Sequence, residues 1–132
     1  MLVTALIPDY TANKSYYGKA LVITLNNGVK MLKSYNTVVA IILPKKVGKV
    51  VVYLPWMNWS VTTGKHVFDF LMQNCVFPDI LKHGFKSFAS FMRDVSRYEY
   101  DCKKRKMVDF SDSTQVREYQ DINKAIHNFK EL

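Results

Sequence analysis

Acidic side chains are almost missing from the first 60 residues of this 132-residue chain. Asp9 is the only acid in that segment and arginine is missing altogether, whereas seven lysines are spread along it. The whole chain carries a formal net charge of +8. So little negative charge beside so many lysines is typical of a protein that meets an acidic partner, such as nucleic acid, an acidic protein surface or a nucleoprotein.

Long apolar runs and cysteine motifs are missing as well. The longest apolar run, residues 37–44, is far shorter than the roughly 20 residues that a membrane-spanning helix needs. The N-terminal apolar residues follow no basic segment, so we expect no secretory signal. Cys75 and Cys102 belong to no tight motif, which favours reduced thiols over a disulfide scaffold. We therefore expect a soluble, cytoplasmic protein with no membrane partner.

The sequence also contains no recognisable catalytic or metal-binding motif. Gly64-Lys65 resembles the end of a phosphate-binding loop, but that loop needs a glycine where Trp59 stands and a hydroxyl residue where His66 stands. No histidine or cysteine pair has the spacing of a zinc site. We therefore expect no metal, no cofactor and no enzymatic activity. A small enzyme without a recognisable motif stays as an alternative, because distant Cys–His partners leave no local pattern.

Two local features of the sequence have both a functional and a purely structural interpretation. The start of the helix expected near residue 63 offers free amides, the hydroxyls of Thr62 and Thr63, and the charge of Lys65, which together can bind a phosphate or carboxylate. Ser60, Thr62 and Thr63 can all cap this helix, and the simpler interpretation of the two threonines is that one of them does so. Cys102 precedes four cations, residues 103–106, which predict a lowered thiol pKa. That basic run is either a solvated linker or a set of phosphate contacts.

We expect one domain, residues 1–132, in three blocks. Residues 1–60 form a basic β-sheet part, in which short β-branched runs alternate with turn signals. Asn27-Gly28 is the strongest signal for a tight hairpin. The run 37–43 is apolar on both faces, which predicts a central strand. The expected strands are residues 19–25, 29–35, 37–43 and 49–54, with an edge strand at 2–7. Their short connections predict an antiparallel meander.

Residues 61–100 form the expected helical part, and residues 101–132 a basic linker with a C-terminal helix. Val67, Phe70 and Leu71 share one face of a helix expected over residues 63–74, which should cover the sheet. A second helix is predicted from Pro78, and a third near residues 111–113. The predicted fold class is α+β: an antiparallel meander of four to five strands followed by two to three helices packed on one face. The other face is expected to be wet and basic, or covered by a partner.

A resemblance adds context. The residues that carry it are Tyr17-Gly18-Lys19-Ala20, Gly28, Leu32 to Thr37 with Val39-Ala40, and Thr62-Thr63 with His66, Phe70-Leu71 and Gln73. Over residues 16–75 the chain looks like a family of small proteins of unknown function from bacterial phages and mobile elements. That family supplies no assigned reaction or site. The resemblance implies an accessory protein of a phage or mobile element, acting in the cytoplasm of a bacterial host.

Lysine, rather than histidine or cysteine, is predicted to carry the function. The candidate binding residues are Lys30, Lys33, Lys45, Lys46, Lys49, Lys65, Lys103, Lys104, Arg105 and Lys106. They predict a non-enzymatic accessory protein that binds nucleic acid or a nucleoprotein complex through a basic surface. The alternative is an anti-CRISPR-like inhibitor that binds a protein complex of bacterial defence. Aromatic residues lie among the lysines, and that mixture suits single-stranded nucleic acid and protein interfaces equally.

Overall fold

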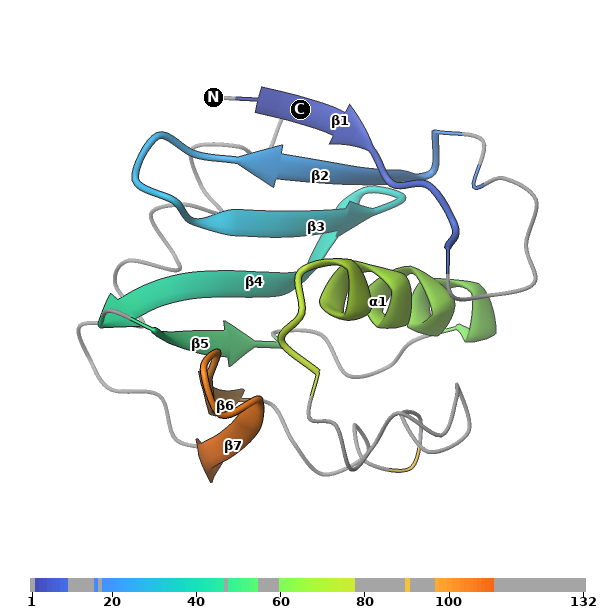
Figure 1. The fold of residues 1–132 in the computed structure, drawn as a ribbon. Helices are drawn as coiled ribbons and strands as arrows, with labels where there is room; N and C mark the ends of the chain where they lie inside the picture. The colour runs from blue at the N-terminus through green and yellow to red at the C-terminus, as the bar shows by residue number, and fades with distance from the viewer. Residues whose placement is uncertain are drawn as a thin grey trace.

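The computed structural model describes residues 2–9, 16, 18–46, 48–54, 60–77, 90 and 97–110. Over these residues the chain forms seven strands and one helix (Figure 1). The elements are β1 (Leu2–Ala5), β2 (Ala20–Thr24), β3 (Lys30–Ser34), β4 (Thr37–Lys46), β5 (Lys49–Tyr53), α1 (Val61–Gln73), β6 (Arg97–Asp101) and β7 (Lys106–Phe110).

The strands form one antiparallel sheet in which chain order is also spatial order, β1 to β7. Because successive strands reverse direction, every second connection lies at the same end of the sheet. The β2–β3, β4–β5 and β6–β7 turns therefore share one end, which we call the basic end. The β3–β4 turn lies at the opposite end, together with the start of α1 and residues 9 and 16; we call this the polar end.

The turns have the backbone that their sequences predict. Gly28 has φ +88° in the β2–β3 turn and Gly48 has φ +79° in the β4–β5 turn. Glycine adopts this left-handed region without the steric cost that a side chain brings. The predicted tight hairpin at Asn27-Gly28 is confirmed: the amide of Gly28 donates to the carbonyl oxygen of Leu25 at 3.0 Å. The amide of Leu25 donates to the carbonyl oxygen of Val29 at 2.8 Å, which closes the hairpin.

α1 lies across one face of the sheet, in front of the central strands in Figure 1. Its predicted packing face is confirmed, because Val67, Phe70 and Leu71 are all 0% exposed. They join the sheet residues Leu32 and Val52 in the larger apolar core. Truncating a buried aromatic such as Phe70 to alanine costs about 3–5 kcal/mol in comparable cores, so this contact is a main source of stability.

The second face of the sheet carries its own apolar cluster, built from Ile23, Met31, Ile41, Leu43 and Val51. Ile23, Met31 and Ile41 are 0% exposed. The expectation of a solvent-exposed, basic face is therefore wrong over these residues, whereas its alternative, a face covered by a partner, stays a prediction. β4 contributes to both clusters, through Ile42 on the helix side and Ile41 on the other, which confirms its central position.

The predicted fold class is wrong. A meander of four to five strands followed by two to three helices is replaced by a seven-stranded sheet with a single helix among the residues that the structure describes. The block predicted as helical ends in β6, and the block predicted as a linker begins with the β6–β7 hairpin. The second and third predicted helices fall on residues 78–96 and 111–132, which lie outside the described residues apart from Ser90.

Candidate nucleic-acid interface

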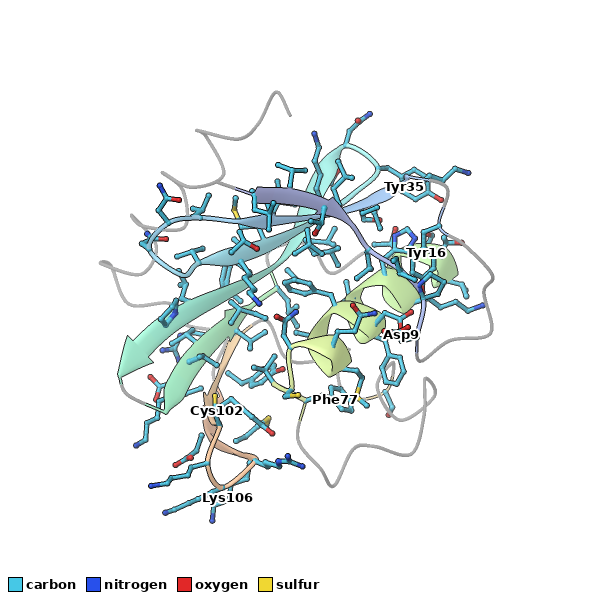
Figure 2. The ribbon with its side chains drawn as sticks, turned by 45° about the horizontal axis from the view of Figure 1, so that its top comes forward. Asp9, Tyr16, Tyr35, Phe77, Cys102 and Lys106 are labelled. Atoms are coloured by element: carbon cyan, nitrogen blue, oxygen red, sulfur yellow. The ribbon has the colours of Figure 1, made fainter. Side chains whose placement is uncertain are left out.

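The basic end collects lysines that are far apart in the sequence. Its β4–β5 turn is flanked by Lys46 and Lys49, which pair with each other across the two strands. Its β6–β7 turn contains the run from Lys103 to Lys106. Lys49 is in turn paired with Asp101, and Asp101 with Lys106, so neighbouring strands bring the cations of both turns to one edge. Figure 2 shows Cys102 and Lys106 at this extremity of the molecule.

The turns of the basic end lie against one another. The amide of Cys102 donates a hydrogen bond to the carbonyl oxygen of Gly48 at 2.8 Å, which joins the β6–β7 turn to the β4–β5 turn. On the other side, a Cβ built on Gly28 would lie 3.2 Å from Cγ of Pro44. The β2–β3 turn therefore lies beside the end of β4. The three turns form a continuous edge rather than three separate loops.

Asp101 holds the backbone of the β6–β7 turn. Its Oδ1 accepts hydrogen bonds from the amides of Lys103 at 2.9 Å and Lys104 at 3.0 Å. The bond from the Lys104 amide is the main cause that lowers the pKa of Asp101, and the charges of Lys104 and Lys49 lower it further. Arg105 completes the turn with φ 53°. The carboxylate thus serves the backbone, while the side chains of residues 103–106 are all exposed.

Cys102 differs from its prediction. The four following cations predict a lowered thiol pKa, but partial desolvation raises the pKa of Cys102, and the Asp101 carboxylate and Cys75 raise it further. A thiol that is harder to ionise is a weaker nucleophile at neutral pH. The structure thus gives no support to a reactive cysteine at the basic end.

The predicted binding residues divide into three groups. Lys103, Lys104, Arg105 and Lys106 are exposed at the β6–β7 turn, and Lys49 is half-buried beside them. Lys45 and Lys46 end β4 at the same edge, but their side chains lie outside what the structure describes. The remaining three are Lys30, Lys33 and Lys65.

Lys30, Lys33 and Lys65 do not join the exposed cations. Lys30 starts β3 at the basic end, but its Nζ donates to Oδ1 of Asn74 at the end of α1, at 2.9 Å. Lys33 is only 6% exposed, and strand alternation puts it on the opposite face from Lys30. Lys65 is half-buried in the first half of α1, toward the polar end. The structure therefore does not bring all ten residues together on one exposed surface, and their role in binding stays a prediction.

The polar end contains a buried hydrogen-bond network that the sequence did not reveal. Ser34, at the end of β3, places its Oγ 2.8 Å from Nδ1 of His66 and 3.1 Å from Oγ1 of Thr63. Ser60 caps α1, since its Oγ accepts from the amide of Thr63 at 3.1 Å. Of the three candidate caps Ser60, Thr62 and Thr63, the structure thus selects Ser60. Because the Thr63 hydroxyl serves the network, the structure favours capping over a phosphate site at this helix start.

Asp69 links α1 to the segment between β1 and β2. It is 0% exposed, its Oδ1 accepts from the amide of Asp9 at 3.1 Å, and its Oδ2 accepts from the hydroxyl of Tyr16. One turn later on the helix, Nε2 of Gln73 donates to the carbonyl oxygen of Ile7 at 2.6 Å. These bonds hold the N-terminal segment against α1. Figure 2 shows Asp9 and Tyr16 beside the helix at this end.

His66 is the titratable centre of the polar end. It is 0% exposed, and the ring of Tyr16 meets it edge-on with 4.3 Å between centroids. Burial lowers the pKa of His66, the Asp69 carboxylate raises it, and Lys19 lowers it again, with a net lowering. Its Nδ1 bonds Ser34, and its Nε2 has no hydrogen-bond partner within the described part of the chain. The imidazole is therefore neutral near pH 7.

Ser34, His66 and Asp69 do not form a nucleophilic triad. In such a triad the carboxylate orients the imidazole through the nitrogen that does not face the serine. Here Ser34 bonds Nδ1, while the oxygens of Asp69 accept from Asp9 and Tyr16. Ser34 is also only 2% exposed, so a substrate has no direct access to its hydroxyl. The arrangement suits structural hydrogen bonding rather than acyl transfer.

One signal could have located part of this network. His66 and Asp69 are three residues apart on one helix, so they must share a face. Ser34, Thr63 and His66 also lie among the residues that carry the family resemblance. The pairing of Tyr16 with Asp69 joins residues 53 apart, and no local pattern predicts such a contact.

Residues 4–87 match the model of a family of unknown function (DUF8033). The chain belongs to this family. The matched region extends beyond residues 16–75, over which the resemblance was seen, and includes every residue of the polar-end network. It ends before β6 and β7, so the DUF8033 match does not include the β6–β7 turn. Neither the search of curated proteins nor that of solved structures found a match.

Two further properties concern the described residues alone. No helix among them is long and apolar enough to cross a membrane. They also bring together no group of three or more histidine, cysteine, aspartate or glutamate side chains that could hold a metal ion.

Proposed function

We propose that this protein binds nucleic acid through the phosphate backbone, using the basic end of its sheet. The observation that supports the proposal is the joining of the β4–β5 and β6–β7 turns by the bond from Cys102 to Gly48. That contact places Lys49 beside the exposed residues Lys103 to Lys106. Exposed lysine and arginine side chains neutralise phosphates and release condensed counterions, which is the main source of sequence-independent affinity.

The acid in this region strengthens the proposal. Asp101 lies among the cations, but it is 8% exposed and its Oδ1 accepts two backbone amides. The carboxylate therefore preorganises the turn and is directed at the backbone rather than at a ligand. A preformed turn loses less conformational entropy on binding than a flexible basic tail does.

The biological setting is proposed from the sequence resemblance. A non-enzymatic accessory protein of a phage or mobile element, acting in the bacterial cytoplasm, would meet nucleic acid or a nucleoprotein complex of the host. Binding through phosphates suits that role because it needs no particular base sequence.

The test is a fluorescence-anisotropy titration of labelled DNA over a salt series. With four phosphate contacts, the affinity for duplex DNA should fall about 10²-fold between 50 mM and 200 mM salt, since the log–log slope is about −0.9 per contact. A Lys104→Gln variant should have a slope smaller by about 1. Lys19→Gln is the matched control, because Lys19 is an exposed lysine outside the basic end and its loss should leave the slope unchanged.

Absence of binding at 50 mM salt would overturn the proposal. Equal effects of Lys104→Gln and Lys19→Gln would also overturn it, because they would show a response to net charge alone. Recovery of one host protein that resists nuclease and high salt would favour the inhibitor of a defence complex instead.

A further inference from the structure

We infer that the basic end is built for double-stranded rather than single-stranded nucleic acid, and that its two cationic turns contact both phosphate rows along one groove. This inference rests on the proposed function and specifies its ligand. Three properties of the described residues carry it: the spacing of the turns, their rigidity, and the kind of side chain that is exposed around them.

The spacing follows from the sheet. The β4–β5 and β6–β7 turns are centred two strands apart, and neighbouring strands lie about 4.8 Å apart, so the centres of the two turns are about 10 Å apart. That separation lies between the widths of the two grooves of B-DNA, about 6 Å and about 12 Å. Lys49 at one turn and Lys104 at the other can therefore reach phosphates on opposite strands.

The rigidity also favours a duplex. The bond from Cys102 to Gly48 joins the turns, and the bonds from Asp101 to the amides of Lys103 and Lys104 hold the second turn in one conformation. A fixed array of charges suits the regular phosphates of a duplex, which carries one charge per about 1.7 Å of its axis. A single strand is more flexible and would have to be ordered on the array, at a cost in conformational entropy.

Single strands need a surface on which bases can stack, and the described part of the basic end offers none. Proteins that bind them combine cations with exposed aromatic rings on which successive bases stack. Tyr98 and Tyr100 of β6 are 0% and 1% exposed, and their hydroxyls donate to the carbonyl oxygens of Val76 and Phe77. Tyr35 is the exposed aromatic side chain among the described residues, and it lies at the polar end.

The test compares a 20-base-pair duplex with one of its strands, in the same buffer at 100 mM salt. The duplex should bind at least about tenfold more tightly than the strand. Duplex binding should also have the steeper salt dependence, because the expected slope per contact is about −0.9 for B-DNA and about −0.7 for single strands. Poly-glutamate of matched charge is the control for a ligand that is merely acidic, and it should bind more weakly than the duplex.

Two single variants test the use of both turns. Lys49→Gln changes the β4–β5 turn, Lys104→Gln changes the β6–β7 turn, and Lys19→Gln again serves as the control. Each of the first two should reduce the duplex salt slope by about 1, and the double variant by about 2. A loss confined to one turn would overturn contact with both phosphate rows.

The outcomes separate this inference from the proposed function. Equal or tighter binding of the single strand, with the basic end still required, would overturn the inference and leave the proposed function standing. Poly-glutamate binding as tight as the duplex would also overturn it, in favour of an acidic protein surface. Binding of neither nucleic acid would overturn both.

Discussion

Ser34, His66 and Asp69 at the polar end are each 2% exposed or less, whereas Lys103 and Lys104 at the basic end are exposed. At the polar end, polar atoms bond to the protein itself and hold α1, β3 and the N-terminal segment together. At the basic end, the Asp101 carboxylate and the bond between Cys102 and Gly48 hold the backbone, and the side chains of residues 103–106 face solvent. Polar side chains therefore determine stability at one end, and are available to a ligand at the other.

The division between the polar end and the basic end coincides with the limit of the family match. The residues of the polar-end network lie within residues 4–87, which match the DUF8033 family, whereas the β6–β7 turn lies beyond them. The comparison predicts that substitutions at the polar end change the free energy of unfolding, and that substitutions of the exposed cations at the basic end change binding alone. The following four changes test this division, from the largest expected effect on the free energy of unfolding to the smallest.

Asp69→Ala should be the most destabilising of the four changes. It removes the carboxylate that accepts from the Asp9 amide and from the buried Tyr16 hydroxyl, and hydrogen bonds to a charged group contribute about 1.5–3 kcal/mol each. We expect a loss of about 3 kcal/mol or more in urea unfolding. Gln73→Ala is the matched control, because Gln73 bonds the same N-terminal segment from an exposed position and should cost less than about 1 kcal/mol. Equal losses for the two variants would show that burial of Asp69 does not matter.

Gly28→Val tests the backbone of the basic end. A side chain at φ +88° is strained, and its Cβ would lie 3.2 Å from Cγ of Pro44, so we expect a loss of about 1–3 kcal/mol. Gly48→Val is the control, since Gly48 has a similar φ of +79° but nothing within 4 Å of the built Cβ. The Gly28 variant should therefore have the lower melting temperature. A lower melting temperature for the Gly48 variant would contradict the close approach of the β2–β3 turn to β4.

His66→Gln should change how stability depends on pH. Because the folded-state pKa of His66 lies below 6.5, the folded protein binds this proton less readily than the unfolded chain does. The contribution of His66 is complete above about pH 6.5 and is lost as the pH falls toward the lower folded-state pKa. Glutamine does not titrate, so the variant should lose less stability than the wild type between pH 7.5 and pH 5. Urea midpoints measured at several pH values give the comparison, and parallel curves would contradict it.

Replacing Lys103 and Lys104 together by glutamine should change stability least. Both side chains are exposed, and surface substitutions of this kind are usually within about 0.5 kcal/mol. The amides that Asp101 accepts stay in place, so the turn should be kept. Urea unfolding should give the wild-type midpoint, while anisotropy shows weaker duplex binding. A clear loss of stability would mean that these side chains, and not only their backbone, hold the hairpin.

The sequence predicts the first five strands well because their signals are local. β-branched runs broken by Asn-Gly and by Gly48 indicate both the strands and the turns between them. The same rule of alternation places Lys30 and Lys33 on opposite faces, so the sequence itself argues against one surface that contains both. The sequence does not predict β6, because this strand has only five residues, with Tyr98 and Tyr100 on one face, and follows a longer helical pattern.

The assembly of the two ends could not be predicted in the same way. Asp69 meets Tyr16 across 53 residues, and Cys102 meets Gly48 only once β5 and β6 have paired. Such contacts depend on the complete sheet, and composition near each residue does not reveal them. The composition shows that lysine is abundant. Which lysines lie together depends on how the strands pair and on which face of the sheet each side chain lies.

The long connection between β5 and β6 has a kinetic consequence. β2 to β5 follow one another through short turns, whereas residues 54–96 separate β5 from its next partner. Contacts between distant residues form late because closing a long loop costs chain entropy before the contact is made. β6 and β7 should therefore dock onto a sheet that has already formed, guided by the hydroxyls of Tyr98 and Tyr100 reaching Val76 and Phe77. The basic end would then be completed last, together with the part of the larger core that Tyr98 and Tyr100 fill, so a partly folded chain would contain the apolar cluster of β2 to β5 before either.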